Sequence, residues 1–491
     1  MAYNTLLRNE VPPKGLVYAL FTMGLISMVG ALLFQHWLLF AIFACSPIAV
    51  LVFIYSVKYP QISYFLYFGI AYYFAAIIRY SNGDGLSVIL DGLLTYALLT
   101  VFLHFVIYRQ QDLKIQNAVN ALTLSYAIWI LFVFVQLINP SASFEKIITT
   151  SRGWILSLPL LYIFSSIILS TPQRLKEVLI VLGIFTLTAF LKVLWQKYRG
   201  FDHTEVTWLM SGAWTTHLLR SGIRYFSFFS DAGNFGSNMG LITIVYGIIT
   251  FHTKGLLLRL FYAGVAFAGI IGLFMSGTRG AIIVPFGGLV LYCLLSKNPK
   301  VMITSIIAGC ALFALMAFTD IGDGNPFIRR MRTAFKPTED ASFNVRKENQ
   351  KRLAYLLKDK PIGIGIGERM IDIENLNVHQ DNIIPPDSFY VDLWIQSGIV
   401  GLTLYISILV AILLRCCYLI MFRIKNKRLR HILAAMLSGV FGLWLNGYAG
   451  NGMGFQPGST ITAAFIAFIL NGPQIDKVLN KRNDNLEIKT K

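Results

Sequence analysis

Arginine side chains suited to binding phosphate occur in three separate stretches of the chain. They are Arg220 and Arg224 in RSGIRYFSFFSDAGNFGSNMG (220–240), Arg279 in SGTRG (276–280), and Arg346 ahead of PIGIGIG (361–367). A guanidinium is planar and presents its donors as a fork, so it binds the oxygens of phosphate or diphosphate in pairs. Next to a low-dielectric region such contacts also stabilise charge that develops on a phosphate leaving group. These stretches predict a site for a phosphate-bearing ligand.

A simpler interpretation exists for two of these arginines. Arg224 and Arg279 each adjoin an apolar run, and their side chains could extend along it to place the charge among lipid headgroups. The occurrence of both next to a long polar loop on the same side of the membrane favours ligand binding.

A fourth stretch, PPDSFY (385–390), carries a carboxylate that could act as a general base. Asp387 follows two prolines where the chain returns to an apolar run, and a general base must be held in a fixed position. Asp387 could equally cap the following helix, and both roles are compatible. His379 is the second candidate base, although a solvated loop histidine is its simpler identity. Ser388 is a possible contact to the ligand.

The glycines of PIGIGIG allow two interpretations. Gly363, Gly365 and Gly367 could let backbone N–H groups approach an anion. The run is no dinucleotide fingerprint, because no strand–helix–strand pattern surrounds it. A tight turn that ends a loop helix is the favoured alternative.

The composition predicts that these stretches connect membrane-spanning helices. Of the 491 residues, 56% are hydrophobic and 13% are charged, against about 25% charged in soluble proteins. The apolar runs are long enough to cross a bilayer and lack the alternation of a β-barrel. We therefore expect an all-α polytopic membrane protein with about 12–14 transmembrane helices and one long, partly helical periplasmic loop. The run 390–421 is long for one span, so its first part is expected to lie at the membrane interface before Gly398 and Gly401.

The charges orient the chain in the membrane. The net charge is +18, and lysine and arginine concentrate in alternate connections, which are cytoplasmic by the positive-inside rule. This arrangement places both termini in the cytoplasm and the arginine stretches on the periplasmic side. The basic balance reflects topology and attraction to anionic membrane lipids, so no nucleic-acid partner is expected. The five cysteines lie in apolar runs and predict neither a disulfide framework nor a metal site.

Six segments follow from this topology. They are N-terminal transmembrane helices (1–194), a periplasmic or interfacial segment (195–234), transmembrane helices with the SGTRG turn (235–318), a large periplasmic loop (319–388), C-terminal transmembrane helices (389–471) and a cytoplasmic tail (472–491). The loop should contain a helix over 343–358, because Leu353 and Leu357 have helical spacing. The tail is polar and is expected to be disordered.

Taken together, the motifs resemble the bacterial O-antigen ligase and O-antigen polymerase superfamily. They are Arg224 in IRYFSFFSDAGNFG, the SGTRG turn, Arg346 ahead of DKPIGIGIG, and WIQSGIVGL (394–402) after the loop exit. Their order, spacing and membrane side carry the resemblance over residues 220–405, whereas the N-terminal spans contribute only hydropathy.

The resemblance implies a GT-C-like membrane glycosyltransferase of the bacterial inner membrane, with its active face in the periplasm. The donor would be a glycan on undecaprenyl diphosphate, and the acceptor a hydroxyl of lipid A–core or of another glycan. Transfer would be inverting and metal-independent, with no cofactor. The arginines, Arg220 and Arg346 included, would bind the diphosphate. The family usually has His-Asn where PPDS stands, so Asp387 takes the position of the usual histidine, with His379 as the alternative base.

Other functions remain possible at this point. A polymerase that joins repeat units would use the same donor chemistry, and we favour the ligase only slightly. A transporter or flippase of polysaccharide precursors should show broken helices and ionisable groups at mid-span. Here the charges lie at the outer rim and in loops, which favours an enzyme. A lipid-binding scaffold would not need arginines gathered on one face.

Overall fold

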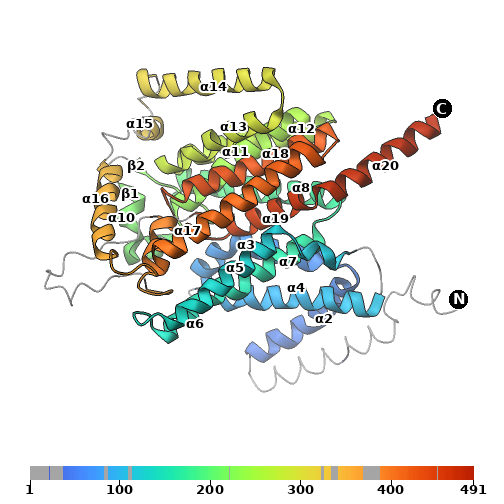
Figure 1. Ribbon diagram of the computed structural model, residues 1–491, viewed down its shortest axis with the longest axis horizontal. Helices are drawn as coiled ribbons and strands as arrows, with labels where there is room; N and C mark the ends of the chain where they lie inside the picture. Colours follow the sequence, from blue (N-terminus) through green and yellow to red (C-terminus); the bar gives the residue numbers. More distant parts are fainter. Residues whose placement is uncertain are drawn as a thin grey trace. The chain divides into compact units, whose positions relative to one another are not determined.

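The structure, a computed structural model, is built almost entirely of α-helices (Figure 1). It describes residues 22, 37–81, 87–108, 113–219, 222–321, 324, 326–332, 335, 341–368, 388–450 and 452–490. The strands of this described part are β1 (Leu218–Leu219) and β2 (Gly222–Ile223), which pair antiparallel. The expected all-α class is confirmed.

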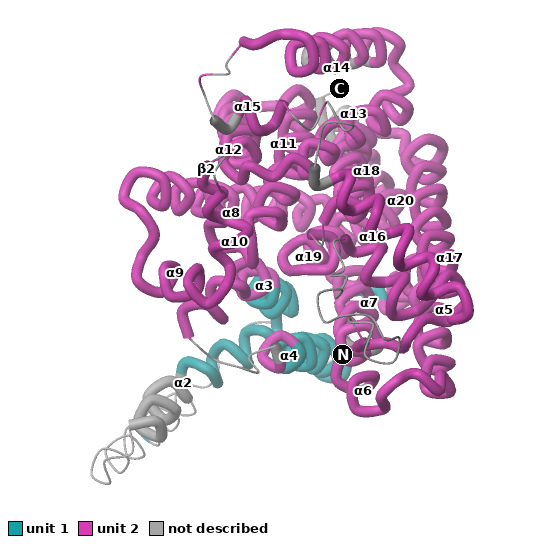
Figure 2. The backbone as a smooth tube through the Cα atoms, turned by 90° about the vertical axis from the view of Figure 1, so that its left-hand side faces the viewer, with its two compact units in different colours: residues 1–67, 91–114 teal, residues 68–90, 115–491 magenta. Residues whose placement is uncertain are grey.

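The chain divides into two compact units, residues 1–67 with 91–114 and residues 68–90 with 115–491 (Figure 2). The smaller unit contains α2 (Trp37–Lys58), the first part of α3 (Gln61–Ser81) and most of α4 (Ser87–Tyr108). Within it, the Ser63 and Thr100 hydroxyls lie 2.9 Å apart and join α3 to α4.

The larger unit holds the end of α3 and the remaining helices. These are α5 (Ala121–Val135), α6 (Phe144–Arg152), α7 (Leu158–Ile168), α8 (Pro172–Tyr198), α9 (His203–Trp208), α10 (Trp214–His217), α11 (Ala232–His252), α12 (Leu256–Met275), α13 (Ile283–Ser296), α14 (Pro299–Phe318), α15 (Pro326–Arg332), α16 (Ala341–Leu356), α17 (Phe389–Tyr418), α18 (Lys427–Asn446), α19 (Gly458–Leu470) and α20 (Gly472–Thr490).

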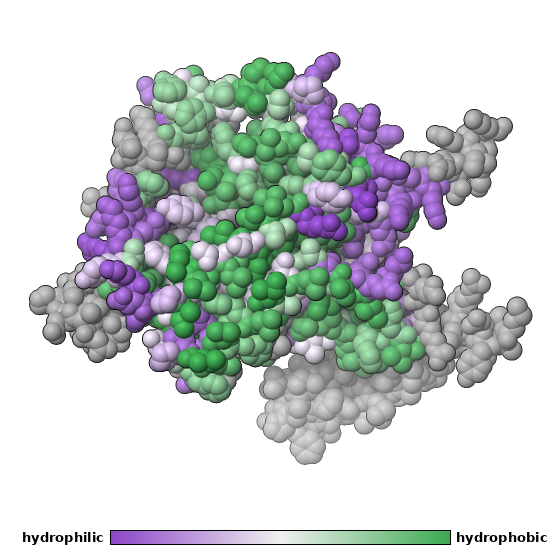
Figure 3. Space-filling view, viewed as in Figure 1, coloured by the Kyte–Doolittle hydropathy of each residue, from purple (hydrophilic) through white to green (hydrophobic). Residues whose placement is uncertain are grey.

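The helices have the length and composition of membrane spans. Nine helices in the described part are long and apolar enough to cross a bilayer, and four shorter apolar helices accompany them. This agrees with the expected number of spans and makes the chain a multi-pass membrane protein. On the face seen in Figure 3, hydrophobic residues cover α17, whereas hydrophilic residues gather around α16.

Helices α11 and α18 form the centre of the larger unit, because most of each is buried. Glycines allow their close packing with α13. A Cβ on Gly288 would lie 2.7 Å from the Ser438 carbonyl oxygen, and a Cβ on Gly442 would collide with the Val284 carbonyl oxygen. Small residues at helix contacts are typical of membrane bundles, where van der Waals packing drives association. The backbones of α13 and α18 therefore lie in close contact in the core.

Helix α17 is broken at Gly398, whose backbone has φ 66° and ψ −171°. Segment 361–368 crosses this break. The Ile364 N–H donates to the Ile395 carbonyl at 3.0 Å, and the Val400 N–H donates to the Pro361 carbonyl at 3.1 Å. Backbone groups that the break frees are thus satisfied by another segment of the chain. The break lies at one of the two glycines before which an interfacial segment is expected, and the interfacial location itself stays a prediction.

The glycines of 363–367 serve this close contact. Gly363, Gly365 and Gly367 have φ of 79°, 109° and 94°, a region that residues with a Cβ rarely adopt. A Cβ on Gly363 would lie 2.5 Å from the Gly398 nitrogen, and a Cβ on Gly365 would collide with Ala142. The left-handed backbone and the close contacts of these residues therefore require glycine, whereas their role as ligand contacts stays a prediction.

The backbone donors of the same segment are engaged within the protein. The Gly363 N–H donates to the Lys360 carbonyl at 2.9 Å, and the Gly365 N–H donates to the Gln396 carbonyl at 3.0 Å. The Gly367 N–H donates to Gln396 Oε1 at 3.0 Å. These three groups point at protein acceptors and do not form a nest open to an anion.

Two further features concern helix ends. Asp231 caps α11, since its Oδ1 accepts from the N–H groups of Gly233 and Asn234 at 2.7 and 2.9 Å. The expectation of a disordered tail is wrong for residues 472–490, which form α20. Asp476 explains part of this order, because its carboxylate accepts from the backbone N–H groups of Lys425 and Asn426 at 3.1 and 2.9 Å.

The contact at the break predicts a large effect of one methyl group. The change Gly363→Ala should lower the free energy of unfolding by about 1–3 kcal/mol, because it adds a Cβ to a left-handed residue that touches backbone. The matched control is Gly247→Ala in α11, where a Cβ meets nothing within 4 Å. Thermal unfolding in detergent measures both, and equal Tm values would contradict the assigned role of Gly363.

Candidate anion-binding site

The predicted site residues fall into two groups. Arg224 follows β2, Arg279 begins the short 3₁₀ helix η5 (Arg279–Ile282), and Arg346 lies in α16. Arg220, His379 and Asp387 lie outside the described residues. Ser388 is buried and caps α17, with its hydroxyl oxygen accepting from the Val391 N–H at 3.3 Å. The capping role considered for Asp387 therefore belongs to its neighbour.

Arg224 is held by its backbone and by its side chain. Its N–H donates to the His217 carbonyl at 2.8 Å, which extends the β1–β2 ribbon. One terminal nitrogen donates to the Thr216 carbonyl at 2.9 Å and the other to the Thr278 hydroxyl at 2.8 Å. The Nε atom is buried and makes no hydrogen bond with any described residue. The guanidinium thus has a fixed orientation and retains one unused donor.

The turn after α12 carries the second part of the site. Thr278 accepts from Arg224 and donates through the same hydroxyl to the Ala232 carbonyl at 2.9 Å, so it joins the turn to the start of α11. Gly277 has φ 57°, which a residue with a Cβ rarely adopts. The Gly277 carbonyl accepts from Arg330 Nε in α15 at 2.7 Å.

Arg330 is a site residue that the sequence analysis missed. A Cβ on Gly277 would lie 3.2 Å from Arg224 Cγ and 3.5 Å from Arg330 Cδ, so the two arginine side chains flank this glycine. Arg330 belongs to the basic run FIRRMR in the long loop. Because that run contains several arginines, the sequence does not indicate which of them contacts the turn at Gly277.

Arginines from three segments share one electrostatic environment. Burial lowers the pKa of Arg224, the carboxylate of Asp231 raises it, and the positive charges of Arg279 and Arg346 lower it further. Arg279 and Arg346 therefore lie close enough to repel the charge of Arg224. Because the Asp231 carboxylate is already engaged as a helix cap, a bound anion would relieve this repulsion.

His217 supports the same ribbon from inside the protein. Its Nε2 accepts from the Ala232 N–H at 3.1 Å, and its Nδ1 lies 2.9 Å from the Ala213 carbonyl, to which it donates in the corresponding tautomer. Burial lowers the pKa of His217, and the charges of Arg224 and Arg79 lower it too, against the opposing effect of the Ala213 carbonyl. A neutral imidazole here links the end of α10 to the start of α11.

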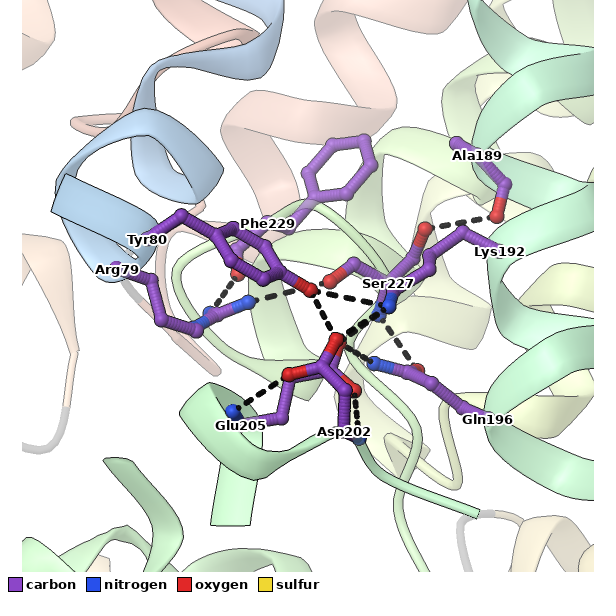
Figure 4. A network of polar contacts seen from close by, with 9 residues as sticks. All are labelled: Arg79, Tyr80, Ala189, Lys192, Gln196, Asp202, Glu205, Ser227 and Phe229. Atoms are coloured by element: carbon purple, nitrogen blue, oxygen red, sulfur yellow. Dashed lines mark hydrogen bonds and ion pairs between the residues drawn. The ribbon is translucent and has the colours of Figure 1, made fainter. Parts of the chain in front are cut away.

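A network behind the site fixes the segment that follows Arg224 (Figure 4). The terminal nitrogens of Arg79, at the end of α3, donate to the carbonyls of Ser227 and Phe229 at 3.2 and 2.5 Å. The Arg79 guanidinium also lies over the rings of Trp208 and Phe226, at 4.4 and 4.5 Å from their centroids. Arg79 thus acts as a buried clamp on this segment.

Ser227 lies at the centre of the clamp in a strained conformation. Its φ of 52° is uncommon for a residue other than glycine. Its N–H donates to Gln196 Oε1 at 3.0 Å, and its hydroxyl donates to the Ala189 carbonyl at 2.7 Å. These two bonds to α8 offset the strain and set the direction in which the chain passes from Arg224 into α11.

Lys192 completes the network from α8. Its ammonium lies 2.9 Å from Asp202 Oδ2, 3.0 Å from Glu205 Oε1 and 3.0 Å from the Tyr80 hydroxyl. The Tyr80 hydroxyl also donates to Asp202. Glu205 is fully buried, and its Oε1 accepts from Gln196 Nε2 at 2.8 Å. Gln196 in turn accepts from the Ser227 N–H, so Gln196 connects the ion pair to Ser227. Lys192 therefore has a positioning role.

The buried ion pair yields a stability prediction. Lys192→Met should lower the free energy of unfolding by about 3–5 kcal/mol, because it leaves the Glu205 charge buried without its cation. The double variant Lys192→Met/Glu205→Met should lose less than the sum of the two single variants. Chemical denaturation in detergent measures the cycle. Strict additivity would mean that the two side chains do not interact in the folded protein.

Comparison with known proteins gives one match. Residues 264–406 match the family model described as O-antigen ligase. The match begins within α12 and ends within α17, so it includes the turn with Arg279, Arg330 and α16 with Arg346, and it begins after Arg224. No curated protein and no solved structure matches the chain. This match over residues 264–406 supports membership of the O-antigen ligase and O-antigen polymerase superfamily.

Proposed function

We propose that the protein is a membrane glycosyltransferase of the ligase type, which transfers a glycan from undecaprenyl diphosphate to an acceptor hydroxyl. The observation that carries the proposal is the position of Arg224, which donates to Thr278 next to Arg279 and whose charge is opposed by Arg279 and Arg346. Arg330 adds a fourth guanidinium-bearing side chain at Gly277. A cluster of this kind suits a diphosphate, which carries several negative oxygens and becomes more negative as it leaves.

The proposed reaction is a direct displacement at the anomeric carbon. The acceptor oxygen forms the new bond from the face opposite the diphosphate, and the bond between the carbon and the diphosphate oxygen breaks, which inverts the configuration. The proton of the acceptor hydroxyl goes to a general base, and the electron pair leaves with the diphosphate. The arginines stabilise this leaving charge, so the step is metal-independent and needs no cofactor.

Asp387 is the proposed base, and His379 is the alternative. Ser388 is held in the N-cap of α17, so Asp387 adjoins a fixed residue at the start of that helix. The family resemblance points to the same position, where a histidine is usual. A carboxylate can accept a proton from a sugar hydroxyl, and a membrane surface raises its basicity.

We place the enzyme in the bacterial inner membrane, with both termini cytoplasmic and the arginine cluster periplasmic. Its partners would be the lipid-linked oligosaccharide donor, an acceptor such as lipid A–core, and membrane lipids. A repeat-unit polymerase with the same donor chemistry is the second candidate. A flippase could use the break in α17, but there the backbone of segment 361–368 fills the break. This favours transfer over transport.

The arginines are tested by transfer in proteoliposomes supplied with a lipid-linked glycan. We expect Arg224→Ala, Arg279→Ala and Arg346→Ala each to lower the rate about 100-fold or more, because each removes charge from the leaving-group site. The matched control is Arg352→Ala on the same helix as Arg346, where the side chain is exposed and pairs with Glu348 at 3.5 Å. Full activity of the Arg279 and Arg346 variants would contradict the site.

The base is tested by exchanging its proton-accepting group. We expect Asp387→Asn to abolish transfer, because an amide cannot accept the proton, and Asp387→His to retain a measurable rate. The parallel variant His379→Gln should keep most of the activity. If His379→Gln is inactive and Asp387→Asn is active, the base is His379. The Tm of each variant, measured beside its rate, separates lost chemistry from lost folding.

A further inference from the structure

The turn at the end of α18, residues 446–450, lies outside the part of the chain that matches the family model. Hydrogen bonds close it, because the Asn446 carbonyl accepts from the N–H groups of Ala449 and Gly450 at 2.8 and 3.0 Å. Asn446 is buried, and its Nδ2 donates to the Ser237 hydroxyl of α11 at 2.6 Å. The turn is therefore held in a fixed conformation at the end of a central helix.

Ala449 connects this turn to the arginine turn. A Cβ on Gly280 would lie 2.6 Å from the Ala449 Cβ, so the Ala449 methyl group fills the space that a side chain at Gly280 would need. Gly280 directly follows Arg279 in η5. The Ala449 methyl group therefore limits how closely the segment with Arg279 approaches α18.

The next residue of the turn contacts the start of α17. The Gly450 carbonyl accepts from the N–H of Phe389, the first residue of α17, at 3.4 Å. The Tyr390 hydroxyl donates to the Trp444 carbonyl of α18 at 2.8 Å, which supports the same approach. Phe389 follows the proposed base Asp387 by two residues. The turn thus adjoins the segment that carries the base.

Tyr448 connects the turn to the helix of the long loop. Its hydroxyl donates to Gln350 Oε1 of α16 at 3.2 Å. Gln350 lies one helical turn after Arg346, so both residues lie on one side of this helix. The turn therefore also contacts the element that carries the third arginine of the site.

We propose that the turn 446–450 positions the arginines against the general base, with Ala449 as its central positioning residue. The proposal rests on the proposed function and adds the element that sets the distance between the leaving group and the acceptor oxygen. The consecutive residues 448, 449 and 450 contact α16, η5 and the start of α17. In a displacement the attacking and leaving oxygens must be aligned, and a misplacement of about 1 Å can cost about 100-fold in rate.

The contact of Ala449 with Gly280 can be tested by moving one methyl group. Gly280→Ala adds a Cβ that collides with the Ala449 Cβ, and Ala449→Gly removes that Cβ and opens a gap. The double variant carries the methyl group on the other side of the same contact. Gly264→Ala in α12 is the matched control, since Gly264 is exposed and its added Cβ meets nothing within 4 Å.

The first experiment measures transfer of a lipid-linked glycan in proteoliposomes, at a temperature at which every variant is folded. We expect Gly280→Ala to lower kcat about tenfold with KM for the donor nearly unchanged, because a displaced Arg279 stabilises the leaving charge less. The double variant should regain most of the lost kcat. A merely structural contact would lower Tm and leave kcat unchanged. That result, or a double variant no faster than Gly280→Ala, would overturn the proposal.

The second experiment reads the arginine site without transfer. Polyprenyl diphosphate without glycan, the leaving group of the proposed reaction, is titrated into the purified protein in a calorimeter. We expect Gly280→Ala to weaken binding about tenfold, the double variant to restore it and Gly264→Ala to match wild type. Equal binding by Gly280→Ala and wild type would overturn the proposal. Weakened and then restored binding in a protein that transfers no glycan would support the role of the turn and refute the proposed function.

Discussion

Repulsion between like charges at the edge of an apolar bundle is the constraint on which the rest of this structure depends. Arg279 and Arg346, which come from two other segments, oppose the charge of Arg224, and burial of Arg224 removes much of the screening that water would supply. The Asp231 carboxylate acts in the opposite sense. The side chain of Arg224 is held in place by two neutral acceptors, the Thr216 carbonyl and the Thr278 hydroxyl.

Two rigid supports make that arrangement possible. Behind Arg224, the ion pair of Lys192 with Glu205 and the clamp of Arg79 hold the chain through Ser227. Beneath α16, segment 361–368 is bonded to the break in α17, and Leu353 of the helix packs with Ile364 and Ile395. The first support consists of an ion pair and arginine hydrogen bonds, and the second consists mainly of backbone hydrogen bonds. Both bring a distant segment to the same turn.

The sequence predicts the parts of this protein that depend on local pattern. Hydropathy gives the helices, and the spacing of Leu353 and Leu357 gives the loop helix. It does not give Arg330, because its partner is the carbonyl of Gly277, and a carbonyl is present at every residue. The polar sequence of residues 472–491 also does not predict the helix α20. Part of its order comes from Asp476, which accepts from two backbone N–H groups just before α18.

The same repulsion explains how such a site would favour a transition state over a bound substrate. In the ground state the two phosphates of a lipid-linked donor are both esterified, and their charge offsets only part of the repulsion around Arg224. As the bond to the sugar breaks, negative charge grows on the leaving oxygen, and each arginine gains attraction while the cost of their proximity falls. Because the guanidinium groups are already oriented, little reorganisation opposes this gain. A site built in this way would bind the departing diphosphate more tightly than the intact donor, which is the condition for catalysis.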